Sequence, residues 1–142
     1  MKDITFGITY FPINSLDDLK AITNLNEDID YDCIFIVARD SSYRILGVAG
    51  VNLKKHQYPR FEHIIIHPSM QKSKLGFILM KEIEKYLTNI NKENYVSYIL
   101  NKNEVMQKYA EKWGMKEYAS NEKGKWYYKD LIQVKEREYV YA

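Results

Sequence analysis

The sequence predicts a single α/β domain built on one mixed sheet. The chain has 142 residues, which is enough for one domain and too few for two ordinary ones. Short apolar runs typical of strands alternate with stretches whose apolar residues recur at steps of three and four, as in helices. Between residues 60 and 90, a strand pattern that ends at a proline gives way to a helical pattern that starts at a glycine. These features predict a strand–helix–strand unit inside a sheet whose other strands run antiparallel.

Seven segments have the apolar character and the turn boundaries of strands. They span residues 5–11, 33–39, 45–53, 60–67, 95–100, 116–119 and 126–132. Helical spacing is found at residues 16–23, 76–90 and 103–113. The inward stripe of the second helix is expected to be Ile78, Leu79, Ile83, Tyr86, Leu87 and Ile90. We expect strands 60–67 and 95–100 to pair in parallel, with a ligand crevice where they meet.

Composition limits the classes of function. The formal net charge is +2, which gives no general electrostatic reason for binding nucleic acid or a membrane surface. The apolar runs are short, so we expect neither a membrane span nor a secretory signal. A single cysteine, Cys33, cannot form a disulfide within the chain, which fits a reducing, cytoplasmic setting. His63 and His67 have no third ligand near them in sequence, so we expect no metal site.

The stretch from residue 62 to residue 77 is the most informative about function. It reads EHIIIHPSMQKSKLGF, so a strand ends at Pro68, a short loop follows, and an amphipathic helix starts at Gly76. The free amides and the dipole at the start of a helix favour an anion. Lys72 and Lys74 add positive charge, and Gly76 lets the backbone approach a ligand closely. A pyrophosphate site is therefore predicted; the alternative is an ordinary strand-to-helix turn with two solvated lysines.

This segment resembles the acetyl-CoA loop of the GNAT family of N-acetyltransferases, in which Gln/Arg-x-x-Gly-x-Gly/Ala follows a strand ending in Val-x-Pro. Here the loop reads QKSKLG from Gln71 to Gly76, after IHP at residues 66–68. A second block, NEVMQKYAEKWGM from Asn103 to Met115, is similar to the family's Asn-x-x-Ala-x-x-Leu/Phe-Tyr-Glu-Lys-x-Gly-Phe. The two blocks have the family's order and spacing. The resemblance implies an acetyl-CoA-dependent N-acetyltransferase, with a mostly antiparallel sheet, a splayed parallel pair and flanking helices.

The resemblance also implies how acetyl-CoA is held. Main-chain groups of Ile64 and Ile66 would pair with the pantetheine arm, and the Ile66 amide would stabilise the oxyanion. Asn103 would bond to the pantetheine region, while Lys108 or Lys112 would meet the phosphates at the nucleotide end. The pyrophosphate would be held by consecutive amides, those of Gln71, Lys72, Ser73, Lys74, Leu75, Gly76 and Phe77.

Glu62 is the candidate catalytic base. It lies where many members of the family carry a carboxylate that takes a proton from the attacking amine. Strict strand alternation would place Glu62 on the face opposite Phe61 and His63. The alternative is a surface carboxylate paired with Arg60 or Lys54 across a hairpin.

The chain departs from the family pattern at two positions. Lys74 stands where the first loop glycine is expected, so its backbone must avoid the left-handed region. Ala110 stands where the family often has the tyrosine that protonates the leaving thiolate, and Tyr109 precedes it. One residue turns a helix by about 100°, so we expect Tyr109 to belong to the core. Tyr98 or a water would then protonate the thiolate, or its release would be unassisted, or the domain would be weakly active or inactive.

An acidic run precedes the second predicted strand and consists of Glu27, Asp28, Asp30 and Asp32. It would attract a cationic acceptor amine, such as a lysine side chain, a polyamine or an aminoglycoside; the alternative is a solvated loop. The segment between the first two strands is short for the family. A short lid would leave the acceptor site open, which favours a protein or peptide amine over an enclosed small molecule.

Two other functions stay open. A GNAT-fold binding module without turnover is favoured by Ala110 and by an aromatic C-terminal region containing Trp126, Tyr127, Tyr128, Tyr139 and Tyr141. A mixed α/β domain outside the family would have no affinity for CoA. The charged tail at residues 133–142 could extend the sheet edge or pair with a second copy in a homodimer. Because repeats and linkers are absent from the sequence, we expect residues 1–142 to form one domain.

Overall fold

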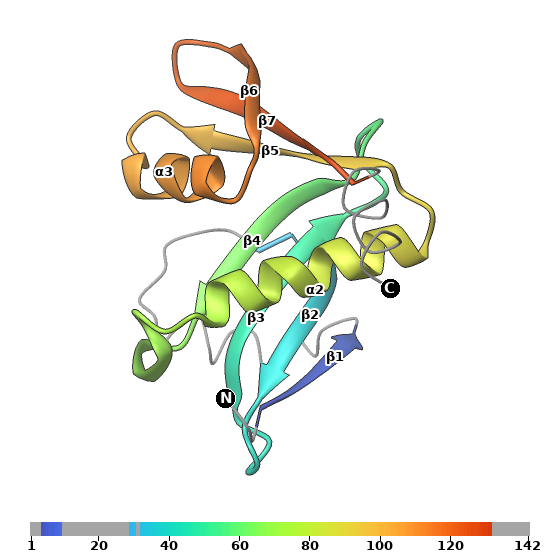
Figure 1. Ribbon diagram of the computed structural model, residues 1–142, viewed down its shortest axis with the longest axis vertical. Coiled ribbons are helices and arrows are strands. Elements are labelled where there is room, and N and C mark those ends of the chain that lie inside the picture. Colours follow the sequence, from blue (N-terminus) through green and yellow to red (C-terminus); the bar gives the residue numbers. More distant parts are fainter. Residues whose placement is uncertain (1–3, 10–28, 31, 132–142) are drawn as a thin grey trace, which may run out of the picture.

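The computed structural model describes residues 4–9, 29–30 and 32–131, which form a seven-stranded mixed sheet with two α-helices. The strands are β1 (Thr5–Thr9), β2 (Ile34–Arg39), β3 (Ile45–Asn52), β4 (Arg60–Ile66), β5 (Asn94–Leu100), β6 (Lys116–Ser120) and β7 (Gly124–Asp130). The helices are α2 (Leu75–Asn89) and α3 (Glu104–Lys112), and the 3-10 turn η1 (Pro68–Met70) precedes α2. The strand order is β1-β2-β3-β4-β5-β7-β6 (Figure 1).

The predicted architecture is confirmed. Of the described strand pairs, β4–β5 is parallel and the others are antiparallel. The predicted strands agree with the observed ones to within two residues wherever both ends are described. The predictions for residues 10–11, 16–23 and 132–142 lie outside the described residues. Neither described helix has the length and hydrophobicity that crossing a bilayer requires.

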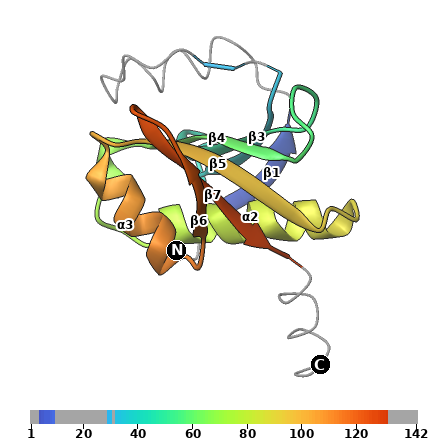
Figure 2. The same ribbon diagram turned by 90° about the horizontal axis from the view of Figure 1, so that it is seen from above.

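The main core lies between α2 and the face of the sheet that this helix covers (Figures 1 and 2). Leu79, Ile83 and Leu87 are fully buried, as the helical stripe predicts. Ile90, which was expected to point inward, is 36% exposed because α2 ends one residue earlier. Gly47 on β3 allows the close approach of α2, since a Cβ there would lie 3.1 Å from side chains of both β4 and α2.

Strands β4 and β5 make few backbone contacts with each other. The register joins these strands at a single pair, Arg60 and Val96. Beside it, the Val96 amide donates to the Pro59 carbonyl at 2.9 Å, and the Ser97 hydroxyl donates to the Phe61 carbonyl at 3.3 Å. Past Phe61 the described strands are no longer paired, so they part as the splayed pair of the predicted fold.

A buried carboxylate on α2 links the two halves of the sheet. Glu84, with a side chain 7% exposed, accepts hydrogen bonds at Oε2 from the Tyr95 hydroxyl and the Trp113 indole, both at 2.8 Å. Lys129 on β7 forms an ion pair with the same oxygen at 2.8 Å, and its ammonium lies 4.4 Å from the centre of the Trp113 ring. Burial and the adjacent carboxylate raise the pKa of Tyr95, so its hydroxyl remains a donor. Glu84 thereby joins α2 to β5, α3 and β7.

Removing this carboxylate should destabilise the domain. We expect Glu84→Ala to lower the free energy of unfolding by about 3–5 kcal/mol, because the partly buried Lys129 loses its counter-charge and the buried Tyr95 and Trp113 donors lose their acceptor. Urea denaturation monitored by circular dichroism measures the change. Glu82→Ala, at a partly exposed position on the same helix, is the matched control and should change stability by about 0.5 kcal/mol or less. Equal losses in the two variants would contradict the linking role of Glu84.

Candidate active site

A β-bulge sets the position of Glu62. In the β3–β4 register, Gly50 lies opposite His63 and Val51 lies opposite Phe61, which leaves Glu62 as an extra residue. Phe61 therefore packs into the core beneath α2, whereas His63 stacks on Phe35 on the other face. The expectation that Phe61 and His63 share a face is wrong, because strict alternation assumes a strand without a bulge.

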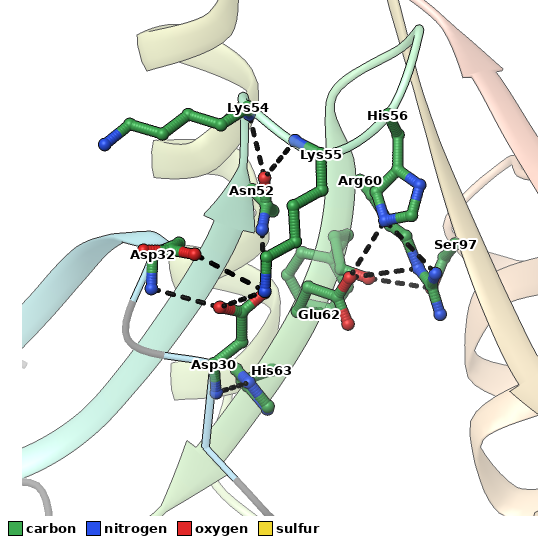
Figure 3. Close-up of polar contacts among 11 residues, drawn as sticks. Asp30, Asp32, Asn52, Lys54, Lys55, His56, Arg60, Glu62, His63 and Ser97 are labelled. Atoms are coloured by element: carbon green, nitrogen blue, oxygen red, sulfur yellow. Dashed lines mark hydrogen bonds and ion pairs between the residues drawn. The ribbon is translucent and has the colours of Figure 1, made fainter.

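The Glu62 carboxylate lies at the point where β4 and β5 begin to part (Figure 3). Its Oε1 is 3.0 Å from Arg60 Nε and 3.8 Å from His56 Nε2, and its side chain is 18% exposed. Arg60 also lies over the ring of Trp126 on β7, with the guanidinium carbon 4.9 Å from the ring centre. Pairing with Arg60 agrees with the surface-carboxylate alternative, and the same contact holds Glu62 beside the gap.

The C-terminal half of β4 directs backbone amides toward the gap between β4 and β5. The His67 amide donates to the Leu46 carbonyl on β3 at 2.8 Å. Because successive residues of a strand direct their amides to opposite sides, those of Ile64 and Ile66 point away from β3. The Gln71 side chain donates to the Ile66 carbonyl at 2.8 Å, which fixes the loop against the end of the strand. The gap is thus lined by strand amides without a strand partner on this side.

In the loop before α2, Lys72 is the residue with a positive φ. This residue has a φ of 65°, while Lys74, at the expected glycine position, has a φ of −84°. Lys74 is the N-cap of α2, so a lysine fits there without strain. The Gly76 and Phe77 amides in the first turn have no hydrogen-bond acceptor among the described residues. Free amides at a helix start form a site suited to an anion.

Gly76 lies against the hydroxyl of Tyr109, which reaches over from α3. A Cβ on Gly76 would lie 2.9 Å from that hydroxyl and 3.7 Å from Ile64 Cδ1, so the three residues meet. The Tyr109 ring stacks on Phe77, with ring centres 4.6 Å apart. Within the described part of the chain, the buried hydroxyl has no hydrogen-bond partner, and burial raises its pKa to about 12. A buried hydroxyl without a partner is costly unless a ligand accepts its hydrogen bond.

The prediction that Tyr109 belongs to the core is correct for its ring and incomplete for its hydroxyl. Helical spacing identifies the inner face of α3 but does not tell whether a polar atom at the end of a side chain finds a partner. Ala110 is 1% exposed and packs in the core, so the neighbouring position contributes no polar group. A ligand with a polar atom beside Gly76 fits these residues.

The three other predicted cofactor residues on or next to α3 are not brought together at the start of α2. Asn103 is the N-cap of α3, and its side chain accepts from the Met106 amide at 3.2 Å. Lys108 is exposed on the same helix. Lys112 lines a separate pocket beside the second half of α2, together with Lys85. The structure therefore brings Tyr109, rather than Lys112, to the start of α2.

Tyr98 lies on the sheet face opposite the helices. Its hydroxyl donates to Asn121 Oδ1 at 2.8 Å, and the same oxygen accepts the amides of Lys123 and Gly124 at 2.9 Å. Its ring centre is 5.0 Å from that of Trp126. Tyr98 thus fastens the β6–β7 turn, and its predicted role as the acid stays a prediction.

The acidic run contributes a structural carboxylate. Asp30 accepts from the Asn52 side chain at 2.7 Å and from Lys55 at 3.3 Å, while its own amide donates to His63 at 3.0 Å (Figure 3). Although burial opposes it, hydrogen bonding by Asn52, the Asp32 amide and Lys55 holds the pKa of Asp30 below its usual value. Asp32 lies 3.4 Å from the same Lys55. These contacts anchor the segment before β2 to the β3–β4 turn.

Two of the four predicted acidic residues, Glu27 and Asp28, lie outside the described residues. Cys33 is buried at the start of β2, and burial raises the pKa of its thiol to about 12. A protonated, buried thiol is a poor nucleophile, as expected for a core residue.

The family can now be identified. The chain belongs to the GNAT family, because the model of the acetyltransferase (GNAT) family matches residues 7–115. This class of protein comprises acyl-CoA N-acyltransferases. No curated protein matches the sequence significantly.

Solved structures with the same fold have little sequence in common with this chain. A spermidine N-acetyltransferase from Vibrio cholerae, as the N152L mutant, is 14% identical, with a TM-score of 0.76 over 97% of this chain and 99% of that one. A GNAT acetyltransferase from Staphylococcus aureus is 14% identical, with a TM-score of 0.68 over 89% and 99%. The ribosomal-protein-S18-alanine N-acetyltransferase from Escherichia coli is 11% identical, with a TM-score of 0.71 over 89% and 94%.

The contact between Gly76 and Tyr109 predicts a specific coupling. We expect Gly76→Ala to cost about 1 kcal/mol of stability, because its Cβ would press on the Tyr109 hydroxyl. In a Tyr109→Phe background the same change should be neutral or stabilising, since the hydroxyl is gone and alanine favours a helix. A double-mutant cycle by urea denaturation measures this. Additive effects would show that the two groups are not in contact.

Proposed function

We propose that this protein transfers the acetyl group of acetyl-CoA to a primary amine. The observation that carries the proposal is the gap between β4 and β5. It opens beyond the Arg60–Val96 pair, is flanked on the helix side by the start of α2, and has the Glu62 carboxylate at its mouth. A donor and an acceptor could therefore reach one point from opposite faces of the sheet.

On the donor side, acetyl-CoA supplies an activated thioester. The proposal assigns its pyrophosphate to the free amides of Gly76 and Phe77, with charge added by Lys72 and Lys74. The orphan hydroxyl of Tyr109 supports this assignment, because a polar atom of the cofactor would satisfy it. The narrow space at Gly76 supports it as well, since a side chain there would fill the approach.

Closer to the chemistry, Ile66 and Glu62 have separate tasks. The Ile66 amide, directed away from β3, would donate to the thioester oxygen as that atom gains negative charge. Glu62 would accept the proton that the amine loses as its bond to the acetyl carbon forms, and the bond from that carbon to sulfur would then break to release CoA as the thiolate. Arg60 would hold the Glu62 carboxylate in place through the contact at 3.0 Å. We assign the acceptor amine to the side of the sheet where Glu62 lies. Glu62 rather than Asp30 or Asp32 is taken as its carboxylate partner, because Lys55 already pairs with those two residues.

The acceptor is proposed as a cationic amine in the cytoplasm. By their names, one similar structure acts on spermidine and another on the alanine of a ribosomal protein, so the fold serves both small molecules and proteins. An acetyl rather than a longer acyl donor is part of the proposal. Comparison of acetyl-CoA with butyryl-CoA as donors distinguishes the two.

A second candidate is a CoA- or protein-binding module without turnover. It is favoured by the buried Ala110, which stands where the family pattern has a tyrosine, and by the exposed aromatic residues on the outer strands. In such a module the acyl donor would bind, but Glu62 would have no effect on any reaction. The two candidates are separated by the experiments that follow.

Substitution of the base should affect turnover alone. We expect Glu62→Gln to lower kcat by about 10²- to 10³-fold, because the isosteric amide cannot accept the proton. The affinity for acetyl-CoA should not change, since Glu62 lies outside the loop that binds the donor. Steady-state kinetics with an amine panel measures kcat, and calorimetry measures binding. Glu117→Gln, an exposed carboxylate paired with Lys125 at 3.3 Å, is the control and should retain full activity. An unchanged kcat in Glu62→Gln would exclude the base assignment.

Binding of the donor has its own test. We expect wild-type protein to bind acetyl-CoA in calorimetry and Gly76→Glu to bind it at least about 100-fold more weakly, because the side chain adds bulk and a like charge at the pyrophosphate position. Lys81→Gln, at an exposed position on the same helix, changes the net charge by the same single unit and should bind normally. Circular dichroism checks that both variants fold. A folded wild-type protein that does not bind acetyl-CoA would refute the proposed function.

A further inference from the structure

Four aromatic side chains form a continuous surface on the sheet face away from the helices. We call this surface the aromatic face; it consists of Tyr98, Tyr118, Trp126 and Tyr128. Tyr98 lies directly opposite Trp126 across β5 and β7, with ring centres 5.0 Å apart. Tyr118 bridges Trp126 and Tyr128, at 6.4 Å and 5.8 Å. The intervening residue of β7, Tyr127, is buried on the helix side, so the strand divides its aromatic residues between the two faces.

A second bulge contributes to the aromatic face. In the β6–β7 register, Glu117 pairs with Tyr127 and Ala119 pairs with Trp126, which leaves Tyr118 unpaired between them. Tyr118 is 52% exposed and Tyr128 is 37% exposed. Burial raises the pKa of Tyr118 above the ordinary value of a phenol, which is itself neutral at physiological pH. Exposed rings gathered on one sheet face are typical of a binding surface rather than of ordinary solvated strands.

The aromatic face is continuous with the candidate base. Arg60 links them, because its guanidinium lies over Trp126 while its Nε lies 3.0 Å from Glu62. At this point the protein itself therefore holds a cation, the Arg60 guanidinium, between an aromatic ring and a carboxylate. The exposed rings of Tyr118 and Tyr128 offer the same kind of contact to a cation from outside.

We propose that the acceptor is a polypeptide whose lysine reaches Glu62 while arginine or lysine side chains next to it stack on the aromatic face. The inference rests on the proposed acetyl transfer and adds the class of acceptor. From β4 to β6 the surface spans three strand spacings, about 14 Å, which an extended chain covers with about four residues. The flanking cations should thus lie within about four positions of the acceptor lysine.

Peptide binding tests this inference separately from turnover. The probes are two unstructured peptides with one central lysine, flanked in one by arginines and in the other by alanines. With wild-type protein and saturating CoA, calorimetry should give about tenfold tighter binding of the arginine peptide. Tyr118→Ser combined with Tyr128→Ser should remove this preference. Tyr43→Ser, which changes a tyrosine 81% exposed on the β2–β3 turn, is the control and should keep it.

Three outcomes would overturn the inference. The first is an equal affinity of the wild-type protein for the two peptides, and the second is a preference for the arginine peptide that survives in the double variant. The third is a change from dimer to monomer when the double variant is compared with the wild-type protein by light scattering. That change would make the aromatic face a contact between two copies of the chain. Absence of acetyl transfer with normal peptide preference would instead refute the proposed function and leave the docking surface in place. Both substituted tyrosines are exposed, and circular dichroism verifies the fold of the double variant.

Discussion

The arrangement of this domain depends on the buried Glu84 carboxylate. β4 and β5 share only one register pair, so the sheet alone would hold its two halves together poorly. Glu84 compensates from α2, because one carboxylate oxygen is bound by Tyr95, Trp113 and Lys129, which lie on the other half. A buried charge is tolerated only when it is paired and hydrogen-bonded, and here each contact also connects a different element.

This linkage allows the sheet to open without coming apart. Glu84 makes its contacts at the helix-covered face, so β4 and β5 are free to diverge toward their C-terminal ends, beyond the Arg60–Val96 pair. The gap then receives backbone amides from β4, the start of α2 at Gly76, and the Tyr109 hydroxyl from α3. Three elements that are distant in sequence thus converge where an anionic donor with polar groups would fit.

The two faces of the sheet have different chemistry. The helix side offers free amides, lysines and a hydroxyl, which suit a phosphate-bearing donor, whereas the open side has a carboxylate, a guanidinium and exposed rings, which suit a cation. The bulge opposite Gly50 lets Glu62 lie on the open side while Ile64 and Ile66, farther along the same strand, pack on the helix side. This division lets the proposed donor and acceptor approach from opposite directions without competing for one surface.

The sequence by itself determined the order of the elements, the parallel pair and the loop at Gln71–Gly76, since periodicity, prolines and glycines act locally. It also singled out Glu62 and Ile66. It could not reveal the bulge that puts His63 on the face opposite Phe61, nor place Lys112 away from the loop. Bulges, orphan hydroxyls and buried ion pairs depend on what lies opposite a residue in space. Only the tertiary structure decided that the Tyr109 hydroxyl meets Gly76 and that Glu84, which is not part of the predicted apolar stripe, is buried and holds the halves of the sheet together.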